Sequence, residues 1–232
     1  GGTKLTAENE VVTYVARNLE PYRGFHVFMR AIPEIQRLRP NAHILIVGGD
    51  EVSYGAALPG GQTYRQWMLA EMGGRIDYSK VHFLGQLPYE TYLSVLQISS
   101  AHIYLTYPFV LSWSFLEAMS AGCAMIGSAT PPVEEVIRDG ENGLLVDFFS
   151  AAEIAEKVNA VLSDPRHMQD MRDNARRTVV DHYDLKARAL PQWQDMIADL
   201  VMGRRPRPER LTEAARLVTP VAAKTRRRSA AA

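Results

Sequence analysis

The chain has 232 residues, of which 47% are apolar and 22% charged, and its formal net charge is zero. A chain of this length and balance can bury a substantial core, as one large or two small globular domains. No run approaches the ~20 apolar residues of a membrane span. The only cysteine, Cys123, excludes an internal disulfide and favours a reducing compartment, so we expect a cytoplasmic protein.

The two ends of the chain differ in composition from its body. The first ten residues, GGTKLTAENE, include neither an initiator methionine nor a signal peptide. We therefore expect residues 1–9 to be a linker or an engineering remnant that follows a missing N-terminal region. From residue 203 onward the sequence contains nine basic residues, only two acidic residues and no aromatic residue. We expect residues 10–202 to fold, residues 203–232 to be a basic, disordered tail, and no nucleic acid to bind.

β-rich runs alternate with amphipathic stretches along the chain. The pattern predicts six strands, over residues 10–16, 42–49, 80–85, 101–107, 123–128 and 142–148. Helices are expected between them, including a short one at 133–140, followed by three C-terminal helical segments at 151–163, 166–183 and 184–201. This alternation is typical of an α/β fold with a doubly wound, six-stranded parallel sheet. Such sheets bind ligands at the carboxyl ends of their strands.

The first strand is followed by the turn ARNLEPYRG, which holds Arg17 and Arg23. Two guanidinium groups that converge at a strand end suit a diphosphate, because each offers paired donors in a plane. A pair of solvated surface arginines is the alternative. After the second strand, Gly48 and Gly49 would let a ligand approach the backbone closely, or would form an ordinary tight turn.

The stretch YPFVLSWSFLEAMSAG carries the third candidate turn. Pro108 ends a strand, and Ser112 or Ser114 can cap the helix that follows, whose N-terminal N–H groups form an anion site. Glu117 can accept hydrogen bonds from sugar hydroxyls, or can serve only as a favourable charge near the helix start.

The remaining polar residues give weaker signals. The six histidines show no metal-ligand spacing, and no D-x-D acid pair is available to hold Mg²⁺ or Mn²⁺. The sequence contains neither a G-x-G-x-x-G fingerprint nor a Walker A loop. We therefore expect no metal and no other cofactor.

Five segments in order resemble the C-terminal, nucleotide-sugar-binding domain of retaining GT-B glycosyltransferases of family GT4 (glycosyltransferases group 1). They are YVARNLEPYRG, PNAHILIVGG, VHFLGQLPYETYLSVLQISSAHIYLTYP, SFLEAMSAGCAMIGS and VEEVIRDGENGLLVD. The resemblance covers about residues 10–200. It implies the Rossmann-like half of a GT-B fold, with extra C-terminal helices.

The resemblance also implies roles for single residues. Arg17 and Arg23 match the pair that grips and stabilises the departing diphosphate, and Glu117 matches the acid that holds the donor ribose. Three backbone segments match those that contact the donor: Leu111, Ser112 and Trp113; the Gly48–Gly49 turn; and the segment from Leu84 to Leu87.

One position departs from the family pattern. Eight residues before Glu117, where the family usually has a glutamate that contacts the hexose, this chain has Phe109. The next pair of the usual pattern, Phe-Gly, is replaced by Leu111-Ser112. The resemblance therefore implies an intact nucleotide half of the site and an altered sugar half.

The leading hypothesis is a retaining, metal-independent hexosyltransferase of polysaccharide or glycolipid biosynthesis, for which this chain supplies the donor-binding half. Its partners would be a UDP-, GDP- or ADP-linked sugar and an N-terminal acceptor-binding domain, with peripheral membrane association only in the full-length protein. Two alternatives stay open. One is a non-catalytic nucleotide-binding or scaffolding module, favoured by Phe109, and the other is a GT-B-like sugar-nucleotide epimerase.

Overall fold

The structure, a computed structural model, describes residues 4–166 and 168–205. The chain divides into two compact units, residues 1–181 and residues 182–232. The predicted basic tail lies, from residue 206 onward, outside the described residues. No helix in the described part of the chain is both long enough and apolar enough to cross a bilayer.

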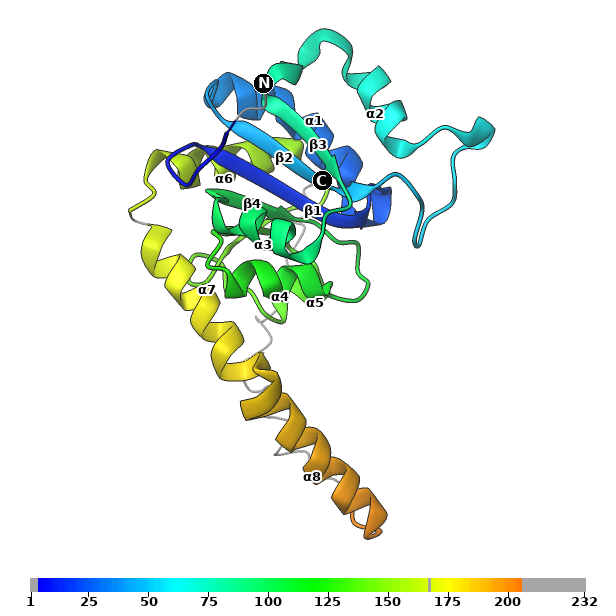
Figure 1. The fold of residues 1–232 in the computed structure, drawn as a ribbon, viewed down its shortest axis with the longest axis vertical. Helices are drawn as coiled ribbons and strands as arrows, with labels where there is room; N and C mark the ends of the chain where they lie inside the picture. The colour runs from blue at the N-terminus through cyan, green and yellow to red at the C-terminus, as the bar shows by residue number, and fades with distance from the viewer. Residues whose placement is uncertain (1–3, 167, 206–232) are drawn as a thin grey trace, which may run out of the picture. The chain divides into compact units, whose positions relative to one another are not determined.

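The first unit is built on one sheet of six parallel strands (Figure 1). They are β1 (Val11–Asn18), β2 (His43–Gly49), β3 (Val81–Gly85), β4 (Ala101–Tyr104), β5 (Met125–Ser128) and β6 (Leu144–Val146). Their order in the sheet is β3-β2-β1-β4-β5-β6. This is the doubly wound, Rossmann-like order, whose direction reverses between β1 and β4. The predicted fold class is confirmed, and each predicted strand is present.

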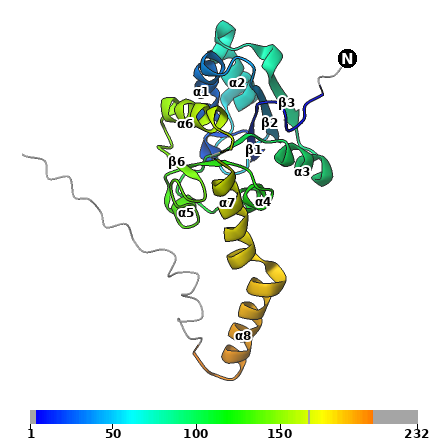
Figure 2. The ribbon, with the colours of Figure 1, turned by 90° about the vertical axis from the view of Figure 1, so that its left-hand side faces the viewer.

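Helices cover both faces of the sheet (Figures 1 and 2). One core cluster joins the sheet to α1 (Phe25–Leu38), α2 (Tyr64–Met72) and α6 (Ala151–Ser163). A second joins the opposite face to α3 (Tyr89–Gln97), α4 (Trp113–Ser120), α5 (Pro131–Glu134) and α7 (Met168–Tyr183). Because both faces are covered, most strand residues are apolar without alternation, and β2 is buried at every position except Gly49.

The turn after β1 places the first predicted site residues. Its 3₁₀ turn, Pro21–Arg23, ends at Gly24, which has a φ of 69° and also begins α1. The pairing of β1 with β2 shifts register between Val15 and Asn18. Such an irregularity re-aims side chains, and Arg17 is indeed exposed at the end of an otherwise buried strand.

Two predicted helices differ from the observed ones. The helix expected at 133–140 is limited to α5, because the side chain of Asn142 folds the following residues into a turn. It accepts from the N–H of Arg138 and donates to the carbonyl of Val136. In the second unit, the helix expected at 184–201 begins as a π-helical turn, Leu185–Ala189, before α8 (Leu190–Val201). Pro191 lacks the N–H that would continue the α-helical ladder there.

A buried histidine predicts how the stability of the fold depends on pH. His102 lies in β4 with no exposed surface, and burial lowers its pKa to about 3. Its unfolded pKa is near 6.5, so the unfolded chain takes up a proton that the folded chain excludes, and stability falls as the pH drops. As the pH falls from about 6.5 to about 5, we expect protonation of His102 in the unfolded chain to lower the free energy of unfolding by about 2 kcal/mol.

The measurement is urea unfolding across this pH range of the natural chain and of His102→Asn. Other histidines contribute equally to both proteins, so the difference reports His102. Equal losses in the two proteins would contradict the assignment.

Candidate functional site

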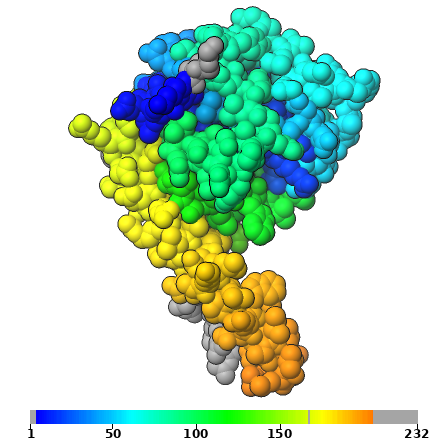
Figure 3. Space-filling model, viewed as in Figure 1, coloured from blue at the N-terminus to red at the C-terminus, as the bar shows by residue number. Residues whose placement is uncertain are grey.

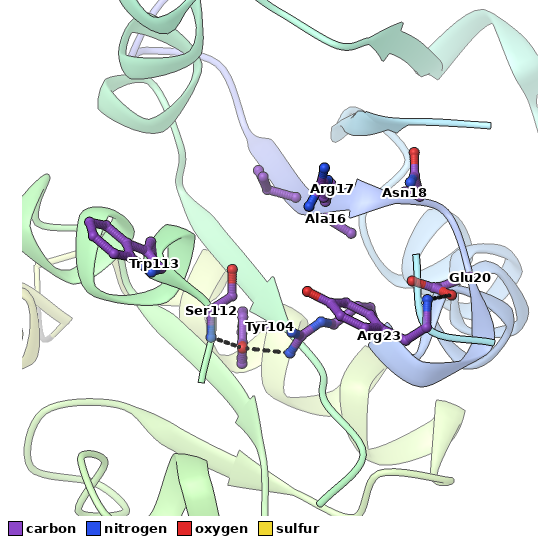
Figure 4. Close-up of a pocket in the computed structure, with 10 residues that line it drawn as sticks. Ala16, Arg17, Asn18, Glu20, Arg23, Tyr104, Ser112 and Trp113 are labelled. Carbon is purple, nitrogen blue, oxygen red and sulfur yellow. Dashed lines mark hydrogen bonds between the residues drawn. The ribbon is translucent and has the colours of Figure 1, made fainter. Parts of the chain in front are cut away.

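A pocket of about 280 Å³ opens at the carboxyl edge of the sheet, where the strand order reverses. Its wall is formed by the end of β1 and the turn after it, by the end of β4, and by the start of α4, with Tyr54 from the loop after β2. Figure 4 shows that the side chains of Arg17, Arg23, Ser112 and Trp113 surround the same space. The switch point is where a doubly wound sheet is expected to bind its ligand.

Arg23 is a buried cation in this wall, with only 7% of its surface exposed. Its Nη1 donates to Tyr104 Oη at 3.1 Å, to Thr106 Oγ1 at 2.7 Å and to the carbonyl of Val110 at 3.1 Å. All three acceptors are neutral, and no carboxylate in the described part of the chain forms an ion pair with this guanidinium. A buried, unpaired positive charge is unfavourable by itself and is suited to an anionic ligand.

Tyr104 connects this arginine to the start of α4. Its hydroxyl accepts from Arg23 Nη1 and, at 2.7 Å, from the N–H of Ser112, the residue that precedes the helix (Figure 4). Burial raises the pKa of Tyr104, so the phenol stays neutral. This link fixes the guanidinium beside the positive end of the helix dipole, where the first N–H groups of the helix have no partner within it.

Arg17 and Trp113 form the outer part of the wall. Arg17 is exposed, and Trp113, the first residue of α4, has 87% of its surface exposed. Of the two serines predicted as candidate caps, Ser112 occupies the N-cap position, but its side chain makes no capping bond, because its Oγ lies 2.9 Å from Ser114 Oγ instead. The N–H groups at the start of α4 are thus not capped by Ser112.

The loop after β2 closes one side of the pocket. Glu20 Oε2 accepts from the N–H of Tyr54 at 3.1 Å and of Gly55 at 2.9 Å, and Asn18 Nδ2 donates to Ser53 Oγ at 2.8 Å. These bonds hold the loop against the turn after β1, next to which it lies in Figure 3 (cyan beside blue).

Comparison of the sequence with models of known protein families identifies the family of this chain. The model of the family described as "Glycosyl transferases group 1" matches residues 3–178. The chain belongs to this family. Among curated relatives of this glycosyl transferase chain, the phosphatidyl-myo-inositol mannosyltransferase of Mycolicibacterium smegmatis is 31% identical, over 68% of this chain and 37% of that protein. The chain thus spans less than half the length of this relative.

Solved structures with the same fold include a sucrose-phosphate synthase and a protein bound to UDP-glucose. Sucrose-phosphate synthase from Thermosynechococcus elongatus is 24% identical, over 86% of this chain and 47% of that one, with a TM-score of 0.71. HepE from Anabaena, in a complex with UDP-glucose, is 21% identical, over 76% of this chain and 45% of that one, with a TM-score of 0.62. These neighbours support the predicted Rossmann-like half of a GT-B fold.

Glu117, the family's expected ribose acid, lies in the second turn of α4 and not in its first. It is half-buried, and its Oε2 accepts a hydrogen bond of 3.0 Å from the hydroxyl of Tyr92 on α3. Glu117 follows Trp113 by one helical turn and does not itself line the pocket. The carboxylate in this largely apolar helix therefore has a protein partner in Tyr92, and Glu117 also raises the pKa of the nearby Tyr89 through its charge and a side-chain hydrogen bond.

The Tyr92 hydroxyl is expected to hold Glu117 in one orientation for a ligand. Tyr92→Phe removes only that hydroxyl, so we expect nucleoside diphosphate affinity to fall about threefold to tenfold, the effect of one ordinary hydrogen bond, because Tyr92 acts on the ligand only through Glu117. Calorimetric titration measures the change. In the background of Glu117→Ala the same substitution should have no further effect on affinity, and an effect of undiminished size there would show that Tyr92 acts independently.

The other residues to which the family resemblance gives a role lie around the pocket and are not part of its wall. A Cβ on Gly48 would stand 2.7 Å from the carbonyl oxygen of Ala16, and one on Gly49 would stand 2.5 Å from Asn18 Oδ1. Packing against the backbone of β1 thus already requires a glycine at position 48, whereas the atoms near position 49 are ends of side chains that can move. Three leucines are partly buried and pack against the second core cluster: Leu84, Leu87 and Leu111.

Phe109, where the family pattern has an acid, covers the buried arginine. Its ring packs on Tyr54 at 4.9 Å between centroids, and the Arg23 guanidinium lies 5.8 Å from the Phe109 ring and 5.4 Å from the Tyr54 ring. These contacts between a cation and aromatic faces are favourable, and they hold the guanidinium in place. At this position the chain therefore has an aromatic cover and no hydrogen-bond acceptor.

Of the predicted site residues, four meet in one pocket: Arg17, Arg23, Ser112 and Trp113. The structure adds Tyr104, Glu20 and Tyr54 to the wall, none of which the sequence singled out. No group of three or more potential metal-ligating side chains of His, Cys, Asp or Glu is present in residues 4–166 and 168–205.

Proposed function

We propose that this chain is the donor-binding half of a retaining glycosyl transferase, with a nucleotide-sugar diphosphate between Arg17, Arg23 and the start of α4. The observation that carries the proposal is Arg23, a buried guanidinium that has no carboxylate partner in residues 4–166 and 168–205 and is linked through Tyr104 to a helix N-terminus. Family membership and the UDP-glucose bound by HepE support the choice of a nucleotide sugar.

The chemistry we propose for these residues is electrostatic. When the bond between sugar and diphosphate breaks, negative charge grows on the departing diphosphate. Arg17, Arg23 and the N–H groups at the start of α4 would face that charge. Because they are already oriented, they need little reorganisation as it develops. Charge stabilisation of this kind is the contribution that we assign to this chain.

The acceptor is proposed to bind to another domain, at the N-terminal side of this one. The relatives named above are about twice as long as the matching region or longer, which supports a second half in the whole protein. The M. smegmatis relative acts on a phosphatidyl-myo-inositol, so a glycolipid is one candidate product class, beside polysaccharides. A cytoplasmic location is proposed because the one cysteine, Cys123, is buried and unpaired.

Calorimetric titration of the chain with UDP, GDP and ADP tests the proposal. We expect one of these to bind, and Arg17→Ala and Glu117→Ala to weaken the binding. If none binds even at millimolar concentration, the donor-site assignment is wrong.

A second candidate, a nucleotide-binding scaffolding module, is favoured by Phe109 alone. Such a module would bind a nucleoside diphosphate with no gain from an attached sugar. Its affinity for the nucleotide sugar would also stay unchanged in Phe109→Glu. A donor-binding domain is expected to bind the nucleotide sugar more tightly than the nucleotide.

A further inference from the structure

Glu20 is a buried carboxylate in the pocket wall. It has no exposed surface and is the only carboxylate among the described residues that line the pocket. Its Oε2 is occupied by the N–H groups of Tyr54 and Gly55. Its Oε1 is buried and has no hydrogen-bond partner among the described residues. Leaving a buried carboxylate oxygen without a hydrogen bond is costly, which points to a ligand group as its partner.

The two arginines of the wall do not take this role. Neither Arg17 nor Arg23 forms an ion pair with Glu20, and Nη1 of Arg23 is directed to neutral acceptors. The wall of the pocket therefore offers two cations, Arg17 and Arg23, and one hydrogen-bond acceptor, Glu20 Oε1, that is not paired with either of them. A ligand that satisfies both brings an anionic group for the arginines and, close to it, a hydrogen-bond donor for Glu20.

The donor sugar fits this requirement better than the ribose. Figure 4 shows Glu20 and Trp113 on opposite sides of the pocket, and Glu117 lies one helical turn beyond Trp113. With the ribose on the Glu117 side, the group that reaches the Glu20 side is the sugar attached to the far phosphate. Its hydroxyl groups are the donors nearest to that phosphate. Phe109 has no polar atom to bind them.

We propose that Glu20 Oε1 accepts a hydrogen bond from a hydroxyl group of the donor sugar, so that Glu20 is a sugar-binding residue of this chain. The inference rests on the proposed function and deepens it, because it defines the ligand as a diphosphate-linked sugar with a free hydroxyl group near the phosphate. The loop contacts of Oε2 and the sugar contact of Oε1 use different oxygens of one side chain.

Glu20→Gln separates these two contacts. In this variant, only the amide oxygen of the glutamine side chain can accept the hydrogen bonds that the N–H groups of Tyr54 and Gly55 donate. The amide NH₂ must therefore take the place of Oε1. The loop stays in place, while the group that faces the pocket changes from an acceptor to a donor. Ser53→Ala is the matched control, because it removes the bond to Asn18 that holds the same loop without changing Glu20.

The measured quantity is the ratio of the dissociation constant of a nucleoside diphosphate to that of its sugar conjugate. The probes are UDP with UDP-glucose, GDP with GDP-mannose, and ADP with ADP-glucose. We expect Glu20→Gln to lower this ratio at least tenfold, with affinity for the free nucleotide retained, as for the loss of a hydrogen bond to a charged acceptor. Retained nucleotide binding also shows that the variant is folded.

The outcomes separate the two claims. If no probe binds to the natural chain, the proposed function fails and this inference fails with it. If nucleotides bind and Glu20→Gln leaves the ratio unchanged, the proposed function stands and the role of Glu20 is wrong. A drop of equal size in Ser53→Ala would assign the effect to the loop and would likewise overturn the inference.

Discussion

Arg23→Met is expected to weaken the binding of nucleoside diphosphates to this chain by about a hundredfold, because a charge-assisted, two-donor contact to phosphate is lost. Methionine keeps much of the side-chain volume beneath the rings of Tyr54 and Phe109, which both lie within 6 Å of the guanidinium. The substitution loses hydrogen bonds but also removes an unpaired buried charge, so its effects on stability oppose each other. Calorimetric affinity is the decisive measurement.

Arg17→Ala separates binding from folding more cleanly. The Arg17 side chain is exposed, so we expect the unfolding free energy to change by less than about 0.5 kcal/mol, while affinity falls about tenfold. The control is Arg37→Ala, which removes the same charge from α1, where the side chain pairs with Glu34 at the surface. Equal affinities of the Arg17 and Arg37 variants would exclude Arg17 from the site.

Gly24→Ala is expected to have the largest effect on stability. Gly24 has a φ of 69°, and a Cβ there would lie 2.4 Å from Leu105 Cβ, a buried atom at the end of β4. The left-handed conformation costs about 1–2 kcal/mol and the steric overlap about 1–3 kcal/mol more, so we expect a loss of about 3 kcal/mol. Thermal unfolding should then shift down by about 10 °C.

Comparison with Gly122→Ala separates the cost of the steric overlap with Leu105 from the cost of the left-handed conformation. Gly122 has a similar φ of 76°, but within the described residues no side-chain or backbone atom crowds the position of an added Cβ to within 4 Å. We expect this variant to lose only about 1–2 kcal/mol. Because Gly24 directly follows Arg23, only Gly24→Ala should also weaken nucleotide binding. Similar stabilities for the two variants would show that the contact with Leu105 relaxes without cost.

Much of the fold follows from local sequence patterns. Each strand is a short apolar run, and a sheet covered on both faces needs no alternation, so runs such as HILIVGG predict buried strands directly. The helix ends are less predictable because they depend on single contacts. The side chain of Asn142 ends one predicted helix early, and Pro191 interrupts another.

The site was predictable only where its residues sit next to a recognisable turn. Arg17 and Arg23 flank one turn, and Ser112 and Trp113 begin one helix, so sequence proximity suffices for them. In the sequence, Tyr104 is one position of the mainly apolar stretch AHIYLTY, and its partner Arg23 is 81 residues away. No local pattern distinguishes Glu20 from other charged residues, because its partners lie in a loop 34 and 35 residues further along. Such pairings exist only once the sheet has formed.

The central claim is that the donor diphosphate binds between Arg17, Arg23 and the start of α4. Two-dimensional NMR of the chain during titration with UDP, GDP or ADP tests this most directly. We predict that the largest shifts occur at the backbone N–H groups of Trp113 and Ser114, at the indole N–H of Trp113 and at the side chain of Arg17. Binding that leaves these signals unchanged and shifts residues elsewhere would contradict the account.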